Sequence, residues 1–377
     1  MAGKVEKLDK RWPLMSVEDG FIISKKGDVT FGYSVRLPEI FTLSNEDYRE
    51  IHNTWAKAFK NLPDNTVIHK QDWFVEEKYV GEIKDSDSYL AKSYKKHFYE
   101  RPYLDHSCFL YITHKPKNRA KASSGRSNLF SKTLPPKITI SAPIMAAFKD
   151  ELEQMKYILQ SSGYFELMPL CSDDICGTEE TIGTLEQYVF LRSPKRNPLL
   201  QDISLNGSVK IGNKKPEIFS LADLEDFPEY TGPRINYDEY STDKNKFSIG
   251  FASCLGLLLD CNHVYNQYIY LDDTKKIVRD LEKKVNTLHS FSKGSRFNSI
   301  TRDGVNDFLN EFTADHRRPV RAHYNIMAWP DSGTDRKEVR NKVSTAIAKM
   351  DASPRVELVA GAQLYWAGIP GNQAELP

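Results

Sequence analysis

The 377-residue sequence contains no G-x-x-x-x-G-K-[ST] phosphate-binding loop. That motif needs glycines so that backbone N–H groups can surround a phosphate, and a lysine that reaches the phosphate charge. The nearest fragment, 177–183, has the wrong spacing and no lysine after its second glycine. We therefore expect no nucleotide hydrolysis by this chain, and neither ATP nor Mg²⁺ as its cofactor.

Other features that the sequence lacks restrict the cellular compartment and the binding partners that we expect for this protein. No apolar run approaches the roughly 20 residues that a membrane-spanning helix needs, and the charged N-terminus lacks the apolar core of a signal peptide. The 52 basic and 51 acidic residues nearly balance, so the whole chain exerts no strong long-range attraction on nucleic acid or on an anionic membrane. The five cysteines are an odd number and fit a reducing compartment better than a disulfide framework. These features predict a cytoplasmic protein.

The cysteine and histidine spacing does not match a metal site. Cys254, Cys261 and His263 lie close together, and Cys171 and Cys176 form a C-x4-C pair. Zinc sites usually need four ligands, with paired cysteines two to four residues apart. Cys254 stands in an apolar segment, where a buried thiol is the expected occupant. We assign no metal ligand.

No arrangement of residues identifies a catalytic site either. The sequence has no G-x-S-x-G nucleophile motif. The carboxylates of Glu76–Glu77 would point to opposite faces of a strand, and Asp272–Asp273 is better explained as a helix cap. His323 alternates with Arg321 and Asn325, a pattern that favours a solvent-facing strand over a polar site. We assign no catalytic residue.

The apolar periodicity predicts an α+β fold with two mixed α/β-sandwich lobes joined by a hairpin-rich middle region. Residues 1–170 form the predicted N-terminal lobe, 171–262 the middle region, and 263–377 the second lobe. Six apolar residues are assigned to one face of a helix in the second lobe: Phe297, Ile300, Val305, Phe308, Leu309 and Phe312.

Local signals predict several elements within these regions. Ser44 and Asp47 have the spacing of a helix N-terminal capping pair. Asn206-Gly207-Ser208 between two short apolar segments is the strongest hairpin signal in the chain. The segment Leu364–Trp366 is predicted to be a final strand that leads into the Gly-Ile-Pro-Gly-Asn corner at 368–372.

The segment 115–137 shows the clearest shift in composition. It carries seven Lys or Arg residues and no Asp or Glu, and it is rich in Ser, Pro and Asn, which predicts a mobile loop. Such a loop could contact phospholipid headgroups, nucleic acid or an acidic protein surface, or it could simply be solvated. The candidate contacts for an anion or a partner are Lys115, Lys117, Arg119, Lys121, Arg126, Lys132 and Lys137.

Several segments, in order along almost the whole chain, resemble one family. They are Leu37–Ser44, His69–Phe74, Glu100–His106, Arg234–Asp238, Asn262–Tyr268 and Trp366–Asn372. These segments are similar to the N-terminal half of TraG-type ATPases of Bacteroides-like conjugative transposons, the cytoplasmic energisers of type IV secretion. In that family a RecA-like motor follows the Pro-Gly-Asn corner, so the resemblance implies that ATP and Mg²⁺ belong to a motor domain outside this chain.

The resemblance implies a non-catalytic docking and coupling role. The partners it implies are other secretion and conjugation subunits at the inner membrane, with self-association of the full-length protein and peripheral membrane attachment through those partners. An alternative is a nucleic-acid-binding module of the conjugation apparatus that acts through the basic loop 115–137. In that case, neutralising Lys117, Arg119 and Lys121 should flatten the salt dependence of binding.

Overall fold

The computed structural model confirms the α+β class. It describes residues 7–81, 84, 86–116, 142–193, 200–205, 208–221, 223–228, 231–257, 259–315, 317–330 and 335–376. The described strands are β1 Leu14–Glu18, β2 Phe21–Ser24, β3 Val29–Arg36, β4 Thr66–Lys78, β5 Pro102–His114, β6 Glu166–Pro169, β7 Ile203–Ser204, β8 Lys210–Ile211, β9 Glu217–Leu221, β10 Arg234–Asn236, β11 Ser248–Gly250, β12 Asn262–Leu271, β13 Arg321–Trp329 and β14 Arg355–Val356.

The described α-helices differ greatly in length and in their surroundings. They are α1 Asn45–Lys60, α2 Tyr89–Phe98, α4 Ala142–Ser161, α5 Ser172–Cys176, α6 Thr184–Phe190, α7 Cys254–Leu257, α8 Thr274–Phe291, α9 Arg296–Ala314, α10 Arg336–Ala348 and α11 Gly361–Ala367. None of the described helices is long and apolar enough to cross a membrane.

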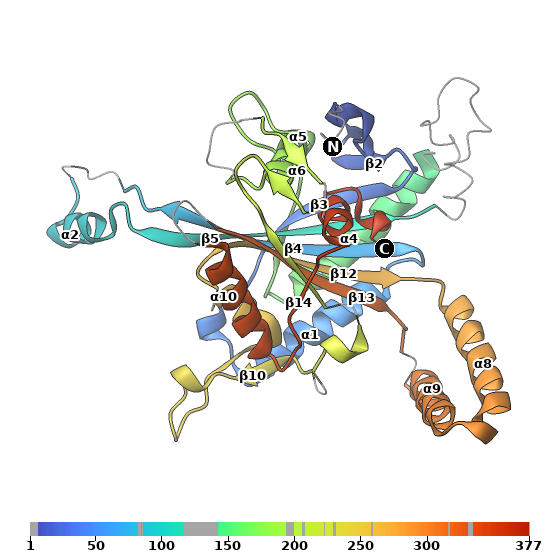
Figure 1. Cartoon of the computed structure of the whole chain (residues 1–377). Helices are drawn as coiled ribbons and strands as arrows, with labels where there is room; N and C mark the ends of the chain where they lie inside the picture. Colours follow the sequence, from blue (N-terminus) through green and yellow to red (C-terminus); the bar gives the residue numbers. More distant parts are fainter. Residues whose placement is uncertain are drawn as a thin grey trace.

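One antiparallel sheet runs through the whole body (Figure 1). Its strand order is β1-β2-β3-β5-β4-β12-β13-β9-β14, with β6 also paired to β3. The central pairing joins β4 to β12 and matches His69 with Tyr268 and Asn266 with Gln71. Strands from the predicted first and second lobes are therefore direct neighbours in one sheet. The division of the chain into three separate domains stays a prediction.

The two faces of the sheet are covered differently. On one face, α1 and α4 pack over one half around buried residues such as Phe148 and Leu152, while α10 packs over the other half around Val339 and Val343. On the opposite face, α5, α6 and α11 pack over a core that contains Trp73 and Trp329. Burial of such large side chains stabilises the fold by about 1.5–3 kcal/mol each.

Several local predictions are confirmed. Ser44 caps α1, and its hydroxyl accepts from the Asp47 backbone while the Asp47 carboxylate accepts from the Ser44 backbone. Asp273 caps α8 by accepting from the Lys276 backbone. The strands β7 and β8 on either side of the Asn206-Gly207-Ser208 signal pair antiparallel, as the hairpin pattern predicts.

One prediction about the C-terminal third is wrong. The segment Leu364–Trp366 belongs to helix α11 instead of a strand, and the Leu364 N–H donates to the Ala360 carbonyl at 3.0 Å. The residues 254–257 also form a helical turn, α7. Both segments are short and apolar, so their side-chain pattern does not separate helix from strand, and packing against the sheet decides.

Candidate functional site

The segment 368–376 lies across the sheet as a strap, and we call it the C-terminal strap. It begins where α11 ends, beside Tyr188, whose hydroxyl donates to the Tyr365 carbonyl at 2.9 Å. The Tyr365 hydroxyl in turn donates to the Val189 carbonyl at 2.6 Å. A Cβ on Gly368 would lie 2.0 Å from the Tyr188 hydroxyl, so a side chain at this position would displace a buried tyrosine. The entry into the strap is tightly packed.

A buried row of polar side chains lies on the sheet next to the strap. Asn266 Oδ1 accepts from His69 Nε2 and from Gln71 Nε2, both at 2.9 Å. Asn266 also donates to Asn325 Oδ1 at 2.9 Å, and Gln71 donates to the Gly368 carbonyl at 3.2 Å. The row therefore connects β13, β12 and β4 to the strap. Buried polar networks of this kind favour the arrangement of the chain that forms their hydrogen bonds.

The expectation of a solvent-facing strand at 321–325 is wrong for Asn325. Arg321 is exposed and His323 is half-buried, but Asn325 is buried within the polar row. Alternation along one strand cannot show that another part of the chain covers that face. Sequence reasoning missed this row because its members are distributed over three strands distant in sequence.

The far end of the strap is held by further polar contacts. The Thr113 hydroxyl on β5 donates to Gln373 Oε1 at 3.2 Å, and the Tyr270 hydroxyl on β12 donates to the Gln373 carbonyl at 3.4 Å. Lys26 forms an ion pair with Glu375. The strap is thus attached to three neighbouring central strands, β5, β4 and β12.

The corner of the strap requires a glycine at Gly371. Its φ is +90°, and a Cβ there would lie 2.5 Å from Ile22 Cγ2 and 2.9 Å from Leu14 Cδ2, both buried side chains. Left-handed strain and overpacking each cost about 1–3 kcal/mol. We expect Gly371→Ala to lower the free energy of unfolding by about 2–4 kcal/mol, as measured by urea denaturation, and to increase hydrogen exchange at the Asn372 amide.

Gly304 supplies the matched control for that change. It lies in the interior of α9, has no positive φ, and a Cβ there would meet nothing within 4 Å. Gly304→Ala is expected to raise stability by up to about 1 kcal/mol, because alanine favours the helix. Equal, small effects of both changes would contradict a rigid corner at Gly371.

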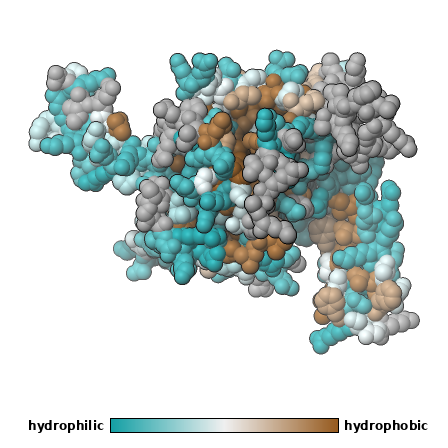
Figure 2. Space-filling view, turned by 45° about the horizontal axis from the view of Figure 1, so that its top comes forward, coloured by the Kyte–Doolittle hydropathy of each residue, from teal (hydrophilic) through white to brown (hydrophobic). Residues whose placement is uncertain are grey.

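Two arms leave the body from opposite ends of the central strands (Figure 1). The long β4–β5 ribbon ends in α2, where Tyr89 and Leu90 are 83% and 77% exposed. At the other end, β12 leads into α8 and α9, which return to β13. Neither α8 nor α9 has a fully buried residue. Figure 2 shows both arms standing clear of the body, with apolar residues on their surfaces.

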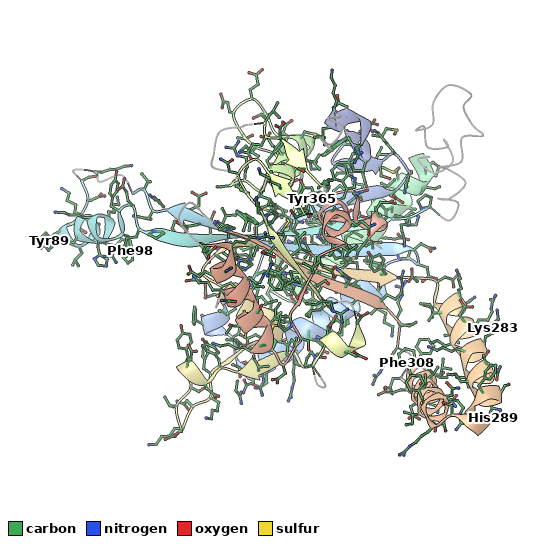
Figure 3. The ribbon with its side chains drawn as sticks, in the orientation of Figure 1. Tyr89, Phe98, Lys283, His289, Phe308 and Tyr365 are labelled. Atoms are coloured by element: carbon green, nitrogen blue, oxygen red, sulfur yellow. The ribbon has the colours of Figure 1, made fainter. Side chains whose placement is uncertain are left out.

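The α2 arm carries an aromatic cluster. Tyr94 and Phe98 have ring centroids 4.6 Å apart, and Tyr79 meets both rings edge-on at 6.5 and 6.4 Å. Arg101 lies 5.8 Å from the Phe98 ring centroid. Figure 3 shows Tyr89 and Phe98 at the end of this arm, away from the sheet. Exposed tyrosines of this kind are typical of protein interfaces.

A large open cavity, about 1240 Å³ in volume, lies on the face of the sheet that α1, α4 and α10 cover. It is situated between the α1–α4 core and the α10 core. Its floor contains Lys70, Asp72 and His106, where Lys70 pairs with Asp72 and His106 Nε2 lies 3.1 Å from Asp72 Oδ1. Burial opposes the charge on Asp72, but Lys70 and His106 hold the pKa of its carboxyl well below its usual range. Cys108 is buried beside them, and this burial raises the pKa of its thiol, which disfavours a nucleophilic role.

Of the predicted basic-loop contacts, the described part of the chain contains only Lys115. Its ammonium lies 3.9 Å from Asp272 and 5.4 Å from the Tyr270 ring centroid, at the base of the α8–α9 arm. Arg321 contacts the same two residues, at 2.5 Å from Asp272 and 4.9 Å from the Tyr270 ring. The other predicted contacts lie outside the described residues: Lys117, Arg119, Lys121, Arg126, Lys132 and Lys137.

The cysteines do not meet in one place. Cys171 and Cys176 are exposed, and Cys254 and Cys261 are buried with free thiols. His263 Nδ1 lies 2.8 Å from the Cys261 carbonyl oxygen, which is a bond to backbone and not to sulfur. Within the described ranges, no three His, Cys, Asp or Glu side chains are grouped so that they could hold a metal ion.

The comparison with known families adds one match. Residues 2–53 match a family model described as "Domain of unknown function, B. Theta Gene description (DUF3875)". The matched segment includes β1, β2, β3 and the first half of α1. No curated protein matches the chain.

Proposed function

We propose that this chain is a non-catalytic docking and coupling region of a conjugative-transfer ATPase of type IV secretion. In this role it links the motor to membrane-bound subunits of the transfer machinery. The support comes from the resemblance of the six segments to TraG-type ATPases and from the arrangement of three surfaces on one sheet. The family match at residues 2–53 is compatible with this role but does not name it.

One observation carries the proposal. The C-terminal strap, the α2 arm and the α8–α9 arm are all attached to the central strands β5, β4, β12 and β13. A displacement of the strap would therefore act on the strands from which both arms extend. Packed sheets are stiff, so a movement at one attachment point is passed to the others instead of being absorbed locally.

The proposal predicts partner binding without catalysis. The purified chain should show no ATP turnover, and it should retain membrane-embedded secretion subunits in a pull-down. We expect Leu90→Ser combined with Tyr94→Ser to reduce that retention about tenfold or more, because tyrosine is a frequent interface anchor and both changes remove apolar area that binding would bury. Retention and melting temperature are measured together, so that loss of fold is recognised.

Met168→Ser provides a matched control, since Met168 is also an exposed apolar residue but lies on the body in β6. It should leave retention unchanged. ATP hydrolysis by the purified chain, or full retention by the α2 double variant, would contradict the proposal. A steeply salt-dependent shift of DNA, lost on neutralising Lys117, Arg119 and Lys121, would favour the nucleic-acid alternative instead.

A further inference from the structure

The distal end of the α8–α9 arm is the part of that arm farthest from the sheet (Figures 1 and 3). The turn Ser292–Gly294 connects the two helices there, and His289 marks this end in Figure 3. Helix α8 has 18 residues, which corresponds to a length of about 27 Å. A surface at this end can therefore be approached without contact with the body.

The charged residues around the turn are all basic. No Asp or Glu occurs between Glu282 and Asp303. Within the described residues, Lys284 and Arg296 form no ion pair, whereas Arg302 is paired with Asp303 at 2.7 Å. Arg296 is the first residue of α9, and the first turn of that helix contains no acidic side chain. A cation at a helix N-terminus is unfavourable, so a bound anion would relieve this repulsion.

Exposed apolar side chains lie near these charges along the chain: Phe297 follows Arg296 directly, and Phe291 lies two helical turns after Lys284 on the same side of α8. Phe291, Phe297 and Ile300 are 65%, 75% and 62% exposed. Phe297 and Ile300 are three residues apart on α9 and so share one side of the helix. The residues of α9 that are half-buried are others, such as Val305 and Leu309. The apolar residues that were predicted to share one face of this helix are thus divided into a half-buried set and an exposed set.

We propose that the distal end of the α8–α9 arm binds the surface of a bilayer that contains anionic phospholipids. Phe291, Phe297 and Ile300 enter the boundary between headgroups and acyl chains, while Lys284 and Arg296 lie near lipid phosphates. Ile300 favours this ligand over nucleic acid, because an aliphatic side chain gains from hydrocarbon but provides no ring on which a base can stack.

This inference goes beyond the proposed function, in which membrane attachment depends on partner subunits. Direct lipid contact at the arm would orient the body, since the opposite arm would then point away from the bilayer. It requires no other protein, so its failure leaves the pull-down result of the α2 arm unaffected.

The test is flotation of the full chain with lipid vesicles. We expect the chain to float with vesicles of phosphatidylglycerol and phosphatidylcholine, and not with phosphatidylcholine alone. Raising the salt concentration should weaken this binding, because exposed charges are screened. Lys284→Gln with Arg296→Gln should lower the partition coefficient about thirtyfold at low salt, since each cation near an anionic surface contributes about 1 kcal/mol.

The apolar contribution has its own variant and a matched control. Phe297→Ser with Ile300→Ser should lower partitioning at least about tenfold. Phe308→Ser is the control, because Phe308 is also exposed on α9 but lies eleven residues after Phe297, toward the end that returns to β13. It should partition like the unmodified chain, and circular dichroism should show the same melting temperature for all variants.

Three results would each overturn the proposal. The first is absence of flotation with anionic vesicles, including the case in which the chain binds a single-stranded oligonucleotide instead. The second is equal binding to vesicles of phosphatidylcholine alone. The third is a loss of binding in Phe308→Ser as large as that in Phe297→Ser with Ile300→Ser.

Discussion

Between pH 7 and pH 4.5 the protein is expected to lose about 5 kcal/mol of unfolding free energy through two buried histidines, His69 and His263. Burial lowers the pKa of both residues to about 4, although the bond from His69 to Asn266 and the bond from His263 to the Cys261 backbone each favour the charged form. In the unfolded chain they titrate near 6.5. The unfolded state therefore binds protons that the folded state does not, and stability falls as the pH drops from 6.5 toward 4.

The difference of about 2.5 pKa units for each histidine, at about 1.4 kcal/mol per unit, corresponds to about 7 kcal/mol for both residues. About 5 kcal/mol of this is lost by pH 4.5, because that pH is still above the pKa of the two residues in the folded chain. Because domains are stabilised by only about 5–15 kcal/mol in total, partial unfolding near pH 4.5 is expected. Urea denaturation at several pH values measures it. His69→Gln and His263→Gln should each remove about half of the slope between pH 6 and pH 4.5, whatever their effect at neutral pH.

A stability that stays flat from pH 7 to pH 5 would show that these imidazoles are hydrated or already protonated in the folded chain. A slope that persists unchanged in the double variant would assign the effect to other groups. The carboxyl of Asp72 does not contribute in this window, because its pKa lies well below its usual range and its protonation costs stability only at more acidic pH.

The second large effect is expected at Asp72. Asp72→Ala should destabilise the fold by about 3–5 kcal/mol at pH 7, because it leaves the ammonium of Lys70 in the cavity floor without its counter-ion. Asp72 is 4% exposed and also bonds to His106, so water cannot readily replace its carboxylate. Thermal and urea denaturation at neutral pH measure the loss.

The matched control is Asp303→Ala, which removes an ion pair with Arg302 on the exposed surface of α9. It should cost less than about 1 kcal/mol. The double change Lys70→Met with Asp72→Leu should recover most of the stability lost in Asp72→Ala, because no buried charge remains unpaired. If Asp72→Ala costs no more than Asp303→Ala, the cavity floor is effectively solvated and the pair is a surface pair.

The fold could be predicted from the sequence wherever the decisive contacts are local. The capping pair Ser44–Asp47 and the cap at Asp273 each involve residues three apart. The hairpin of β2 and β3 likewise depends on a short turn between two β-rich segments. Such signals need no knowledge of the rest of the chain, since the interacting groups are brought together by the element itself.

The candidate sites depend on contacts that no local pattern contains. The polar row joins His69 and Gln71 to Asn266 and Asn325, with separations of up to 197 residues between bonded side chains. On α9, the helical spacing of the apolar residues predicts one apolar face. Only packing against α8 decides which half of that face remains exposed. The basic segment 115–137 was the strongest compositional signal, yet its described member Lys115 is held by Asp272 and Tyr270.

The sequence by itself determined the α+β class, the caps of α1 and α8, the pairing of β7 with β8 and the absence of a phosphate-binding loop, because periodicity, caps and motifs are properties of short segments. Tertiary structure alone decided that one sheet joins both predicted lobes and that α11 is a helix. It also decided that the strap covers a polar row and that the two arms extend in opposite directions, one from β4 and β5 and the other from β12 and β13. These features follow from pairing and burial between distant segments, and the free energy of that burial outweighs the local preferences that a sequence reveals.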